Sequence, residues 1–379
     1  EISPLIYQLG NEILGENNHD QFGWSVSTSD NGLIVAIGSP WADVNFSSNT
    51  SEGTVKIYHY VNYEWSQLGH TIFGEGAGDF SGYSVSISGN GDRVLIGGRH
   101  NDGNGSNSGH ARVYEYDEKS STWIQLGSDI DGEAPGDRAG QSVSISGDGH
   151  TVAIGGYYND GNGSDSGHTR VFKYNNGSWV QLGSDIDGEN AGDLSGYSVS
   201  ISNDGKRVAI GANYNTGHPT AGHAAGHVRI YDYNESTFTW VQTDSDIDGA
   251  ITLDESGYSV SLSGDGSTVA IGAFAHHMWY SQYINGQVRV YKIGNSENVI
   301  NHLLKDPYAR NRSHYIQPTN THQVGWTYKE SVGAYFNSHF TDTRVGSNVV
   351  LTHGVYYIKF QITIDPNGNY FFMKMYIRE

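Results

Sequence analysis

Residues 84–98 read SVSISGNGDRVLIGG, and variants of this stretch occur five times along the chain. In SVSIS the apolar Val85 and Ile87 alternate with serines, which is the pattern of a β-strand with one buried face. The GNG turn favours a tight hairpin, because Gly and Asn tolerate a positive φ. The apolar run RVLIGG then predicts a second strand. The other copies begin at Ser25, Ser142, Ser198 and Ser259.

Each copy continues in the same way. After a polar loop comes a Tyr-rich segment such as HARVYEY (110–116), and four of the five copies then have a Trp segment such as WIQLGSDIDGE (123–133). The loop itself is nearly duplicated, as NDGNGSNSGH (101–110) and NDGNGSDSGH (159–168). Four antiparallel strands repeated every 56 to 61 residues predict the blades of a β-propeller. A lone blade leaves both faces of its sheet exposed, so the blades must stack around an axis.

The number of segments predicts how the ring closes. The fifth copy ends at QVRVYKIG (287–294) without a Trp segment, while PLIYQLGNEILGE (4–16) matches the missing one. We therefore predict an all-β protein with a five-bladed β-propeller at residues 1–294, whose N-terminal strand completes blade 5. This arrangement would leave no open sheet edge.

Residues 295–379 lack the repeat, and we predict a separate, small β-rich domain there. NSENVINHLLKD (295–306) is expected to form a short leading helix. GVYYIKFQITIDPNGNYFFMKMYIRE (354–379) is expected to form a long hairpin. Its apolar residues should be buried in that domain, against the propeller, or against another copy of the protein. The last possibility would make 354–379 a self-assembly element that works by strand addition.

The repeating units resemble FG-GAP repeats, the blades of the integrin α-subunit propeller and of many secreted bacterial and algal proteins. The matching stretches are QFGWSV (21–26), SGYSVS (81–86, 195–200 and 256–261) and AGQSVS (139–144), followed by AIGSP (36–40), LIGG, AIGG and AIGA. The resemblance covers about residues 4–294 and implies the fold, whereas propellers host many functions. Integrin-type repeats carry a calcium loop between the first two strands. Here that turn is only GDG or DNG, with too few carboxylates to enclose calcium.

Composition narrows the classes of partner. The net charge is −20, and residues 1–294 contain 13 Lys and Arg against 35 Asp and Glu. Such a field disfavours nucleic acid and anionic membrane surfaces. No stretch has the length of a transmembrane helix, and the absence of Cys excludes disulfides and thiolate metal sites.

We expect an extracellular or surface-associated protein. The chain begins EISPLIYQLG, without a basic and apolar leader, so any signal peptide was removed or never existed. Seven glycosylation sequons are compatible with secretion, although several would arise by chance in a chain rich in Asn and Ser. They lie at Asn45, Asn49, Asn104, Asn162, Asn176, Asn234 and Asn311.

The duplicated loop is the first candidate metal site. Oxygen-bearing side chains stand at alternate positions, as they do in calcium loops, so this loop suggests Ca²⁺ as a cofactor. The same pattern fits a turn whose side chains bond its own backbone. The residues are Asp102, Asn104 and Ser106 in one copy, and Asp160, Asn162, Ser164 and Asp165 in the other.

Other polar residues recur in every blade. Acidic residues stand three positions before the first-strand glycine, and we expect them to hold turn amides rather than to catalyse a reaction. They are Asp20, Asp79, Asp137, Asp193 and Asp254. His110, His168 and His227 open the third strand of three blades and are expected to be packing residues. A zinc site remains a second possibility for His227 together with His218, His223, His276 and His277.

Two loops depart from the repeated sequence, and we expect a ligand site at these loops. SPWADVNFSSNTSEG (39–53) in blade 1 and AFAHHMWYSQYING (273–286) in blade 5 replace the polar loop with aromatic residues, on the face that binds ligands in the integrin relatives. Exposed aromatics beside Asn, Asp and His suit a glycan or protein ligand, unless they pack under the C-terminal segment. The candidate ligand-binding residues are Trp41, Tyr157, Tyr158, Tyr214, Phe274, His276, His277, Trp279, Tyr280 and Tyr283.

These features favour a non-enzymatic extracellular recognition or adhesion module that binds a glycan or a protein through this loop face. A structural subunit of a surface filament or virion appendage, assembled through the C-terminal hairpin, is the alternative. A polysaccharide hydrolase or lyase ranks last, because no distinctive pair of acids stands out.

Overall fold

The computed structural model describes residues 7–43, 50–216, 224–274 and 286–294, together with the backbone of residues 357–364 and 371–378. The described residues form β-strands and no helices. These ranges therefore contain no helix that is long and apolar enough to span a membrane. The chain divides into two compact units, Glu1–Ile293 and Gly294–Glu379. The helix predicted at 295–306 lies outside the described residues.

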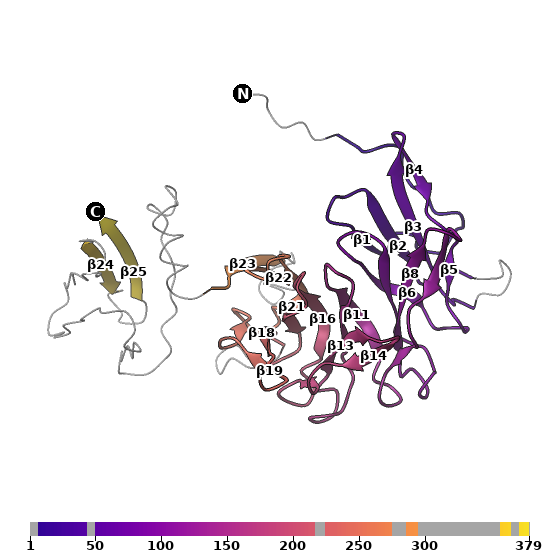
Figure 1. The fold of residues 1–379 in the computed structure, drawn as a ribbon. Helices are drawn as coiled ribbons and strands as arrows, with labels where there is room; N and C mark the ends of the chain where they lie inside the picture. The colour runs from indigo at the N-terminus through magenta and orange to yellow at the C-terminus, as the bar shows by residue number, and fades with distance from the viewer. Residues whose placement is uncertain are drawn as a thin grey trace. The chain divides into compact units, whose positions relative to one another are not determined.

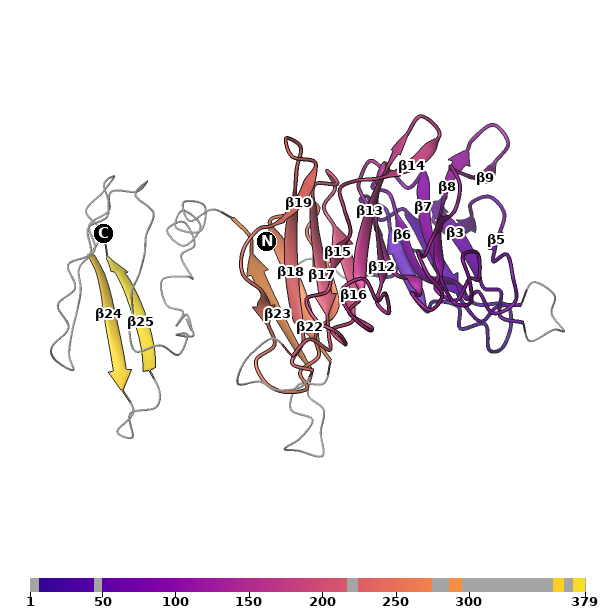
Figure 2. The same ribbon diagram turned by 90° about the horizontal axis from the view of Figure 1, so that it is seen from below.

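Four five-stranded sheets and one three-stranded sheet follow one another in the described part of the first unit, in chain order (Figures 1 and 2). The second sheet contains β6 (Ser81–Ile87), β7 (Arg93–Gly98), β8 (His110–Asp117), β9 (Thr122–Gln125) and β10 (Ile130–Asp131). The first contains β1 (Ser25–Thr28), β2 (Ile34–Ser39), β3 (Thr54–Val61), β4 (Glu64–Gln67) and β5 (Ile72–Phe73). The third contains β11 (Ala139–Ile145), β12 (Thr151–Gly156), β13 (His168–Asn175), β14 (Ser178–Gln181) and β15 (Ile186–Asp187). The fourth contains β16 (Ser195–Ile201), β17 (Arg207–Ala212), β18 (His227–Asn234), β19 (Thr239–Gln242) and β20 (Ile247–Asp248), and the fifth contains β21 (Ser256–Leu262), β22 (Thr268–Ala273) and β23 (Gln287–Lys292).

The Trp segment is two strands, where the sequence predicted one. β9 pairs with one end of β8 and β10 pairs with its other end, so both lie on the same edge of the sheet. The chain breaks between them at Gly127, whose φ of +77° is a left-handed conformation that interrupts the ladder.

The hydrophobic core lies between consecutive sheets. One cluster, for example, joins Leu95 and Val113 of the second sheet to Val143 and Ile154 of the third. Since the second, third and fourth sheets bury both faces in this way, the sheets stack as propeller blades do. The first strands lie on the inner side of the arc in Figure 1, and β4, β14 and β19 lie on its outer side.

The serines of the SVSIS strands bond the next sheet. Ser84 Oγ donates a hydrogen bond to the carbonyl oxygen of Gly140, and Ser86 Oγ accepts one from the backbone N–H of Ile145. The same two bonds recur at every described junction between consecutive sheets. The alternation therefore has two uses, because Val and Ile pack toward the preceding sheet while the serines bond the following one.

Glycines recur in the first strand (as in SGYSVS) and in the second strand (as in AIGG) of each sheet. A second-strand glycine of one sheet meets the first-strand glycine of the next sheet at each described junction. A Cβ added to Gly155 would overlap the carbonyl oxygen of Gly196, which belongs to the first strand of the next sheet. Gly38, Gly97 and Gly211 face equivalent glycines at the other junctions. The backbones thus approach so closely that no side chain fits between them.

The predicted N-terminal strand is not formed in the structure. Residues 7–16 contain no strand, and β23 pairs only with β22 among the described residues. The segment nevertheless makes the contacts of a Trp segment with the first sheet. Trp65 Nε1 donates to the Leu9 carbonyl oxygen, as Trp123 Nε1 does to that of Leu68. Closure of the ring stays a prediction.

The second unit contains the predicted hairpin. β24 (Tyr357–Ile364) pairs antiparallel with β25 (Phe371–Arg378), with Tyr357 opposite Arg378 and Ile364 opposite Phe371. The two strands pair only with each other within the described part of this unit.

Candidate functional site

A strip of aromatic residues crosses the first strands of the sheets. In four of the five repeats, an aromatic residue follows the first-strand glycine directly: Trp24, Tyr83, Tyr197 and Tyr258, with Gln141 in the remaining repeat. Because the first strands of neighbouring sheets are bonded to one another, these side chains lie in sequence along the inner side of the array. We use the name central strip for these four residues together with a set of rings and guanidinium groups that connect to them directly or through one another. The set is Trp41, Phe80, Arg99, His100, Arg138, Tyr157, Tyr158 and Phe274.

Ring contacts connect the central strip at both ends. At one end Trp24 packs on Trp41, with ring centroids 4.8 Å apart, and on Tyr83, at 5.4 Å. At the other end Tyr197 lies between Tyr157, at 5.6 Å, and Tyr258, at 5.1 Å. The remaining ring contacts of the strip are Trp41–Phe80, Trp41–Tyr83, Phe80–His100, Tyr157–Tyr158 and Tyr258–Phe274.

Two arginines contact the aromatic rings of the strip, one at each end. The Arg99 guanidinium lies 3.8 Å from the ring centroid of Tyr83, and its Nη1 donates to Gln141 Oε1. Arg138 lies 4.7 Å from the ring centroid of Tyr158 and donates to the hydroxyl oxygen of Tyr157. Both geometries are those of cation–π pairs.

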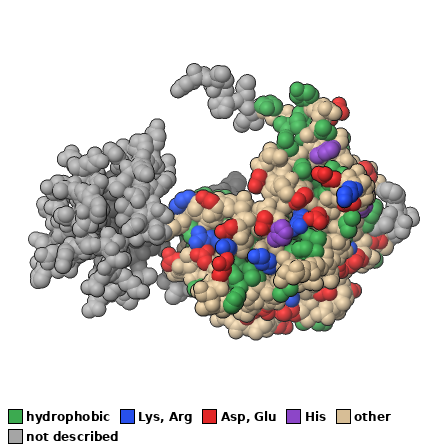
Figure 3. Space-filling model, viewed as in Figure 1, with side chains coloured by type: hydrophobic (Ala, Val, Ile, Leu, Met, Phe, Trp, Pro, Cys, Tyr) green, Lys and Arg blue, Asp and Glu red, His purple; other side chains and the backbone are tan. Residues whose placement is uncertain are grey.

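These two arginines differ from most others in the protein. Arg93, Arg112, Arg170, Arg207 and Arg229 each pair with a carboxylate. Among the described residues, Arg99 and Arg138 form no such ion pair. Burial, reinforced by the charges of Arg99 and Arg138, lowers the pKa of His100 to about 4. The strip is therefore a cationic, aromatic surface within a protein whose acidic side chains are spread over its surface (Figure 3).

The structure brings together part of the predicted ligand set. Trp41, Tyr157, Tyr158 and Phe274 belong to the strip, and of these Tyr157 is buried. Tyr214 is half-exposed and makes no ring contact in the described ranges. His276, His277, Trp279, Tyr280 and Tyr283 lie outside the described residues. The sequence analysis missed Trp24, Tyr83, Tyr197, Tyr258 and both arginines, although the recurring aromatic after the glycine was a usable signal.

Hydrogen bonds account for the duplicated loop. Asp102 Oδ1 accepts from the backbone N–H of Asn107, and Asn104 Nδ2 donates to the carbonyl oxygens of Gly132 and Glu133. Asp160 and Asn162 make the same bonds in the second copy. The loop thus clamps the segment that leads to the next sheet. Calcium binding by Asp102, Asn104, Ser106, Asp160, Asn162, Ser164 and Asp165 stays a prediction.

The same bonds bear on two of the glycosylation sequons. A glycan would be attached to Nδ2 of Asn104 or Asn162, the atom that each residue uses for both clamp bonds. Modification there would require the clamp to open. Asn176 lies in the turn between β13 and β14, and Asn234 is the last residue of β18. Asn45, Asn49 and Asn311 lie outside the described residues.

Four of the five recurring acids hold turn amides, as the sequence predicted, whereas Asp20 accepts a hydrogen bond from the side chain of Asn17. Asp137 is buried, and its Oδ2 accepts hydrogen bonds from the backbone N–H groups of Glu133 and Ala134 and from Asn159 Nδ2. Asp79 and Asp193 bind Asn101 and Asn215 in the same way. A carboxylate with three donors is a structural group, and its recurrence needs no catalytic explanation.

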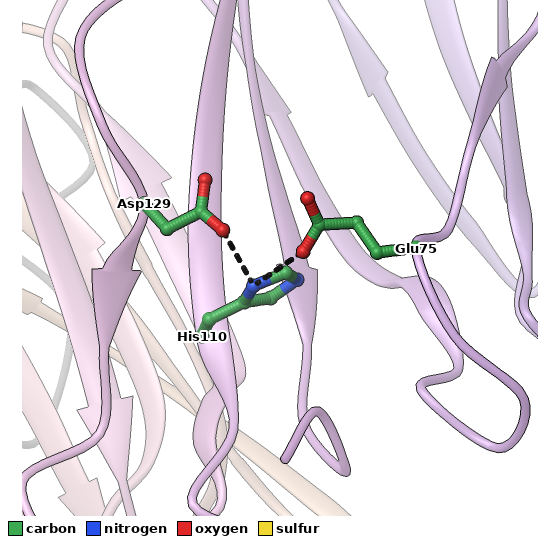
Figure 4. A group of neighbouring side chains, drawn as sticks. All are labelled: Glu75, His110 and Asp129. Carbon is green, nitrogen blue, oxygen red and sulfur yellow. Dashed lines mark ion pairs between the residues drawn. The ribbon is translucent and has the colours of Figure 1, made fainter. Parts of the chain in front are cut away.

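The histidines expected to be packing residues are part of a second constellation (Figure 4). Glu75 follows β5, His110 opens β8, and Asp129 immediately precedes β10. His110 Nδ1 lies 3.8 Å from Glu75 Oε2 and 3.5 Å from Asp129 Oδ2. The ring is 1% exposed, and Nδ1 has no hydrogen-bond partner.

The arrangement occurs three times, and we call each copy a triad. The triads are Glu75–His110–Asp129, Glu133–His168–Asp185 and Glu189–His227–Asp246, and in each the three ligand atoms lie within 4.8 Å of one another. Burial, with a contribution from the neighbouring arginines, lowers the pKa of both His168 and His227 to about 4. These imidazoles are therefore neutral near pH 7. His227 belongs to a triad, whereas the other histidines of the predicted zinc cluster lie outside the described residues.

Neighbouring residues orient both carboxylates of a triad. Gln125 Nε2 donates to Asp129 Oδ1 at 2.6 Å, and Arg112 Nη1 lies 3.3 Å from Glu75 Oε1. Each carboxylate thus uses one oxygen to be held in place and turns the other toward the imidazole. The sequence analysis missed the triads because the carboxylates stand 17 to 38 positions from their histidine.

Comparison with known proteins identifies the repeat. Curated protein sequences gave no match. Solved structures similar to this chain include hydrazine synthase of Kuenenia stuttgartiensis, with 15% identity, a TM-score of 0.45, and coverage of 75% of this chain and 67% of that one. A proposed 6-phosphogluconolactonase of Bacteroides uniformis has 13% identity, a TM-score of 0.47, and coverage of 93% and 84%. Such weak likenesses assign no activity. The FG-GAP repeat model matches residues 74–114 and 130–172, so the chain carries FG-GAP repeats, as its motifs implied.

Proposed function

We propose that the protein is a non-enzymatic recognition module that binds an anionic carbohydrate through the central strip. The observation that carries the proposal is the presence, in one strip, of partly exposed aromatic rings and of Arg99 and Arg138, which lack carboxylate partners in the described residues. Aromatic faces stack on apolar surfaces of a ligand, and the planar guanidinium matches carboxylate or sulfate groups. A net charge of −20 would otherwise repel such a ligand.

A protein ligand is the second candidate for the same surface. Trp, Tyr and Arg dominate the energetics of protein–protein contacts as well. An enzymatic role has less support, because the imidazole of each triad is at most 1% exposed, which leaves almost none of its surface for a substrate to contact.

The proposal includes a closed five-bladed ring, because a ring would bring Trp24 at one end of the strip toward Phe274 at the other. The two ends of the array expose the apolar positions that junctions bury. Val26 of β1 is 63% exposed, whereas the equivalent Val85, Val143 and Val199 are buried. Val288 and Val290 of β23 are 71% and 65% exposed, while Val55 and Ile57 of β3 are fully buried. Joining these two faces would remove both patches from water.

The first and the fifth sheet also carry hydrogen-bonding groups that would pair if the ring closed, at the positions that form the bonds of the other junctions. Ser259 and Ser261 of β21 have no bonds of the kind that Ser84 and Ser86 make, within the described ranges. In a ring, their partners would be the carbonyl oxygen of Gly23 and the backbone N–H of Thr28. Glu16 already forms an ion pair with Lys56, the counterpart of the Glu75–Arg112 pair.

We further propose that the protein acts outside the cell or at its surface, where adhesion to glycans takes place. A structural role is the alternative that the hairpin favours, since β24 and β25 pair only with each other in the described residues and would each offer an edge for strand addition. Light scattering of the full chain distinguishes the two. A monodisperse monomer at high concentration would argue against filament assembly.

A glycan array tests the recognition proposal. We expect the wild-type protein to bind glycans with carboxylate or sulfate groups, and Trp41→Ala or Arg138→Ala to weaken binding about tenfold or more, as loss of a central contact does. Phe238→Ala is the matched control, because this ring is 71% exposed on an outer hairpin. A fully folded Arg138→Ala variant with unchanged binding would contradict the proposal. An array without any signal would direct attention to a protein ligand.

A further inference from the structure

We propose that each triad binds one divalent transition-metal ion, with Zn²⁺ as the expected species. The chain would then hold three equivalent ions, one at each of the second, third and fourth sheets. At each of these sheets, the glutamate comes from the segment that leads in from the preceding sheet. This inference is independent of the ligand that the central strip takes.

The distances fit such an ion. The Nδ1 atoms lie 3.5 to 4.0 Å from the facing carboxylate oxygens in the three triads. These separations are too long for good hydrogen bonds. Two ligand atoms bound to one tetrahedral Zn²⁺ at about 2.0 to 2.2 Å lie roughly 3.4 Å apart. Since the three ligand atoms of each triad lie within 4.8 Å of one another, an ion can be accommodated with side-chain shifts of less than about 1 Å.

The buried imidazole lacks any other partner. Nδ1 of His110, His168 and His227 is buried without a hydrogen bond, and each ring is at most 1% exposed. A buried polar nitrogen without a partner is costly, and three equivalent copies of one are not an accident of a single site. Figure 4 shows the nitrogen facing one oxygen from each of two carboxylates.

The donor set selects the class of metal. One imidazole and two carboxylates suit zinc and its first-row neighbours, whereas calcium and magnesium prefer oxygen ligands alone. The Gln125–Asp129 hydrogen bond and the Arg112–Glu75 ion pair hold the outer oxygens, as outer-shell groups do around metal ligands.

The two sheets that lack the histidine supply an internal comparison. In the first sheet Thr54 stands at the position of His110, and Thr71 stands at the position of Asp129. In the fifth sheet Gln287 replaces the histidine, and Ala250 replaces the glutamate. His therefore occurs only where both carboxylates occur. A purely packing role for the ring would not require both acids.

Zinc titration of the chelator-treated full chain, combined with elemental analysis, tests the proposal. We expect His168→Gln, which copies the native Gln287, to bind one ion fewer than the wild type. The triple variant H110Q/H168Q/H227Q should bind three fewer. His150→Gln is the matched control, because His150 lies beside Asp148 at the surface and belongs to no triad. It should retain every ion.

Two further measurements keep the test independent of folding defects. Asp185→Asn removes one ligand at constant size and should also lose one ion, while circular dichroism reports the fold. Crystals soaked in zinc should show anomalous density between Nδ1 and the two facing carboxylate oxygens of each triad. Unchanged stoichiometry in the folded triple variant, or anomalous density only elsewhere, would overturn the assignment.

Discussion

Val290→Asp is expected to lower the free energy of unfolding by roughly 3 kcal/mol or more, the cost of leaving a charge buried and unpaired. In the described array Val290 is 65% exposed, so a polar residue there would be harmless if the array stayed open. In a closed ring the side chain takes the place of Ile57, which is fully buried against the next sheet. Urea unfolding followed by tryptophan fluorescence measures the difference.

Val241→Asp is the control for this experiment. Val241 is 49% exposed on β19, at the outer edge of its sheet, where closure of the ring would not cover it. We expect a change within about 0.5 kcal/mol, as is usual for surface substitutions. If Val290→Asp and Val241→Asp have the same small effect, the ring is open and the proposed closure is wrong. Val26→Asp should repeat the larger loss from the opposite face.

Gly155→Ala is expected to destabilise the protein by about 3 kcal/mol or more. The added methyl group would overlap the backbone carbonyl oxygen of Gly196, and a backbone of the neighbouring sheet cannot move aside as a flexible side chain does. The loss would appear as a lower urea midpoint with an unchanged slope.

Gly177→Ala separates this overlap from the general cost of replacing glycine. Gly177 has a φ of +92° in an outer turn, and a Cβ there would meet no atom within 4 Å. Only the strain of the left-handed backbone remains, at about 1 to 2 kcal/mol. Equal losses in the two variants would mean that the third and fourth sheets can separate at little cost.

The sequence predicted those features that depend on local pattern. The alternation in SVSIS, the glycine turns and the five-fold repeat identified the sheets and their order, and the C-terminal hairpin followed from long alternating strands. The sequence analysis did not predict the break in the Trp segment at Gly127, because LGSDID (126–131) shows no clear alternation of apolar and polar residues. The equivalence of 4–16 to the Trp segments was recognised, yet the strand itself is absent from the described residues.

The candidate sites were harder to predict, because they depend on which residues meet across a junction. His110 has a packing role on its own strand, and only the junction places Glu75 and Asp129 beside its Nδ1. Arg99 lies on Tyr83 of its own sheet, and its hydrogen bond to Gln141 on β11 of the next sheet likewise depends on the junction. The clamp made by Asn104 explains the duplicated loop better than its resemblance to a calcium loop does.

The hydrogen bonds that serines and tryptophans make between sheets reach only the adjacent sheet. Such a chain of nearest-neighbour links should yield to a pulling force one sheet at a time, beginning at a free end. A ring offers no free end, so the first rupture would have to break two junctions together. A tethered protein that contains such a ring would keep its fold under shear up to a threshold force and would then unfold abruptly.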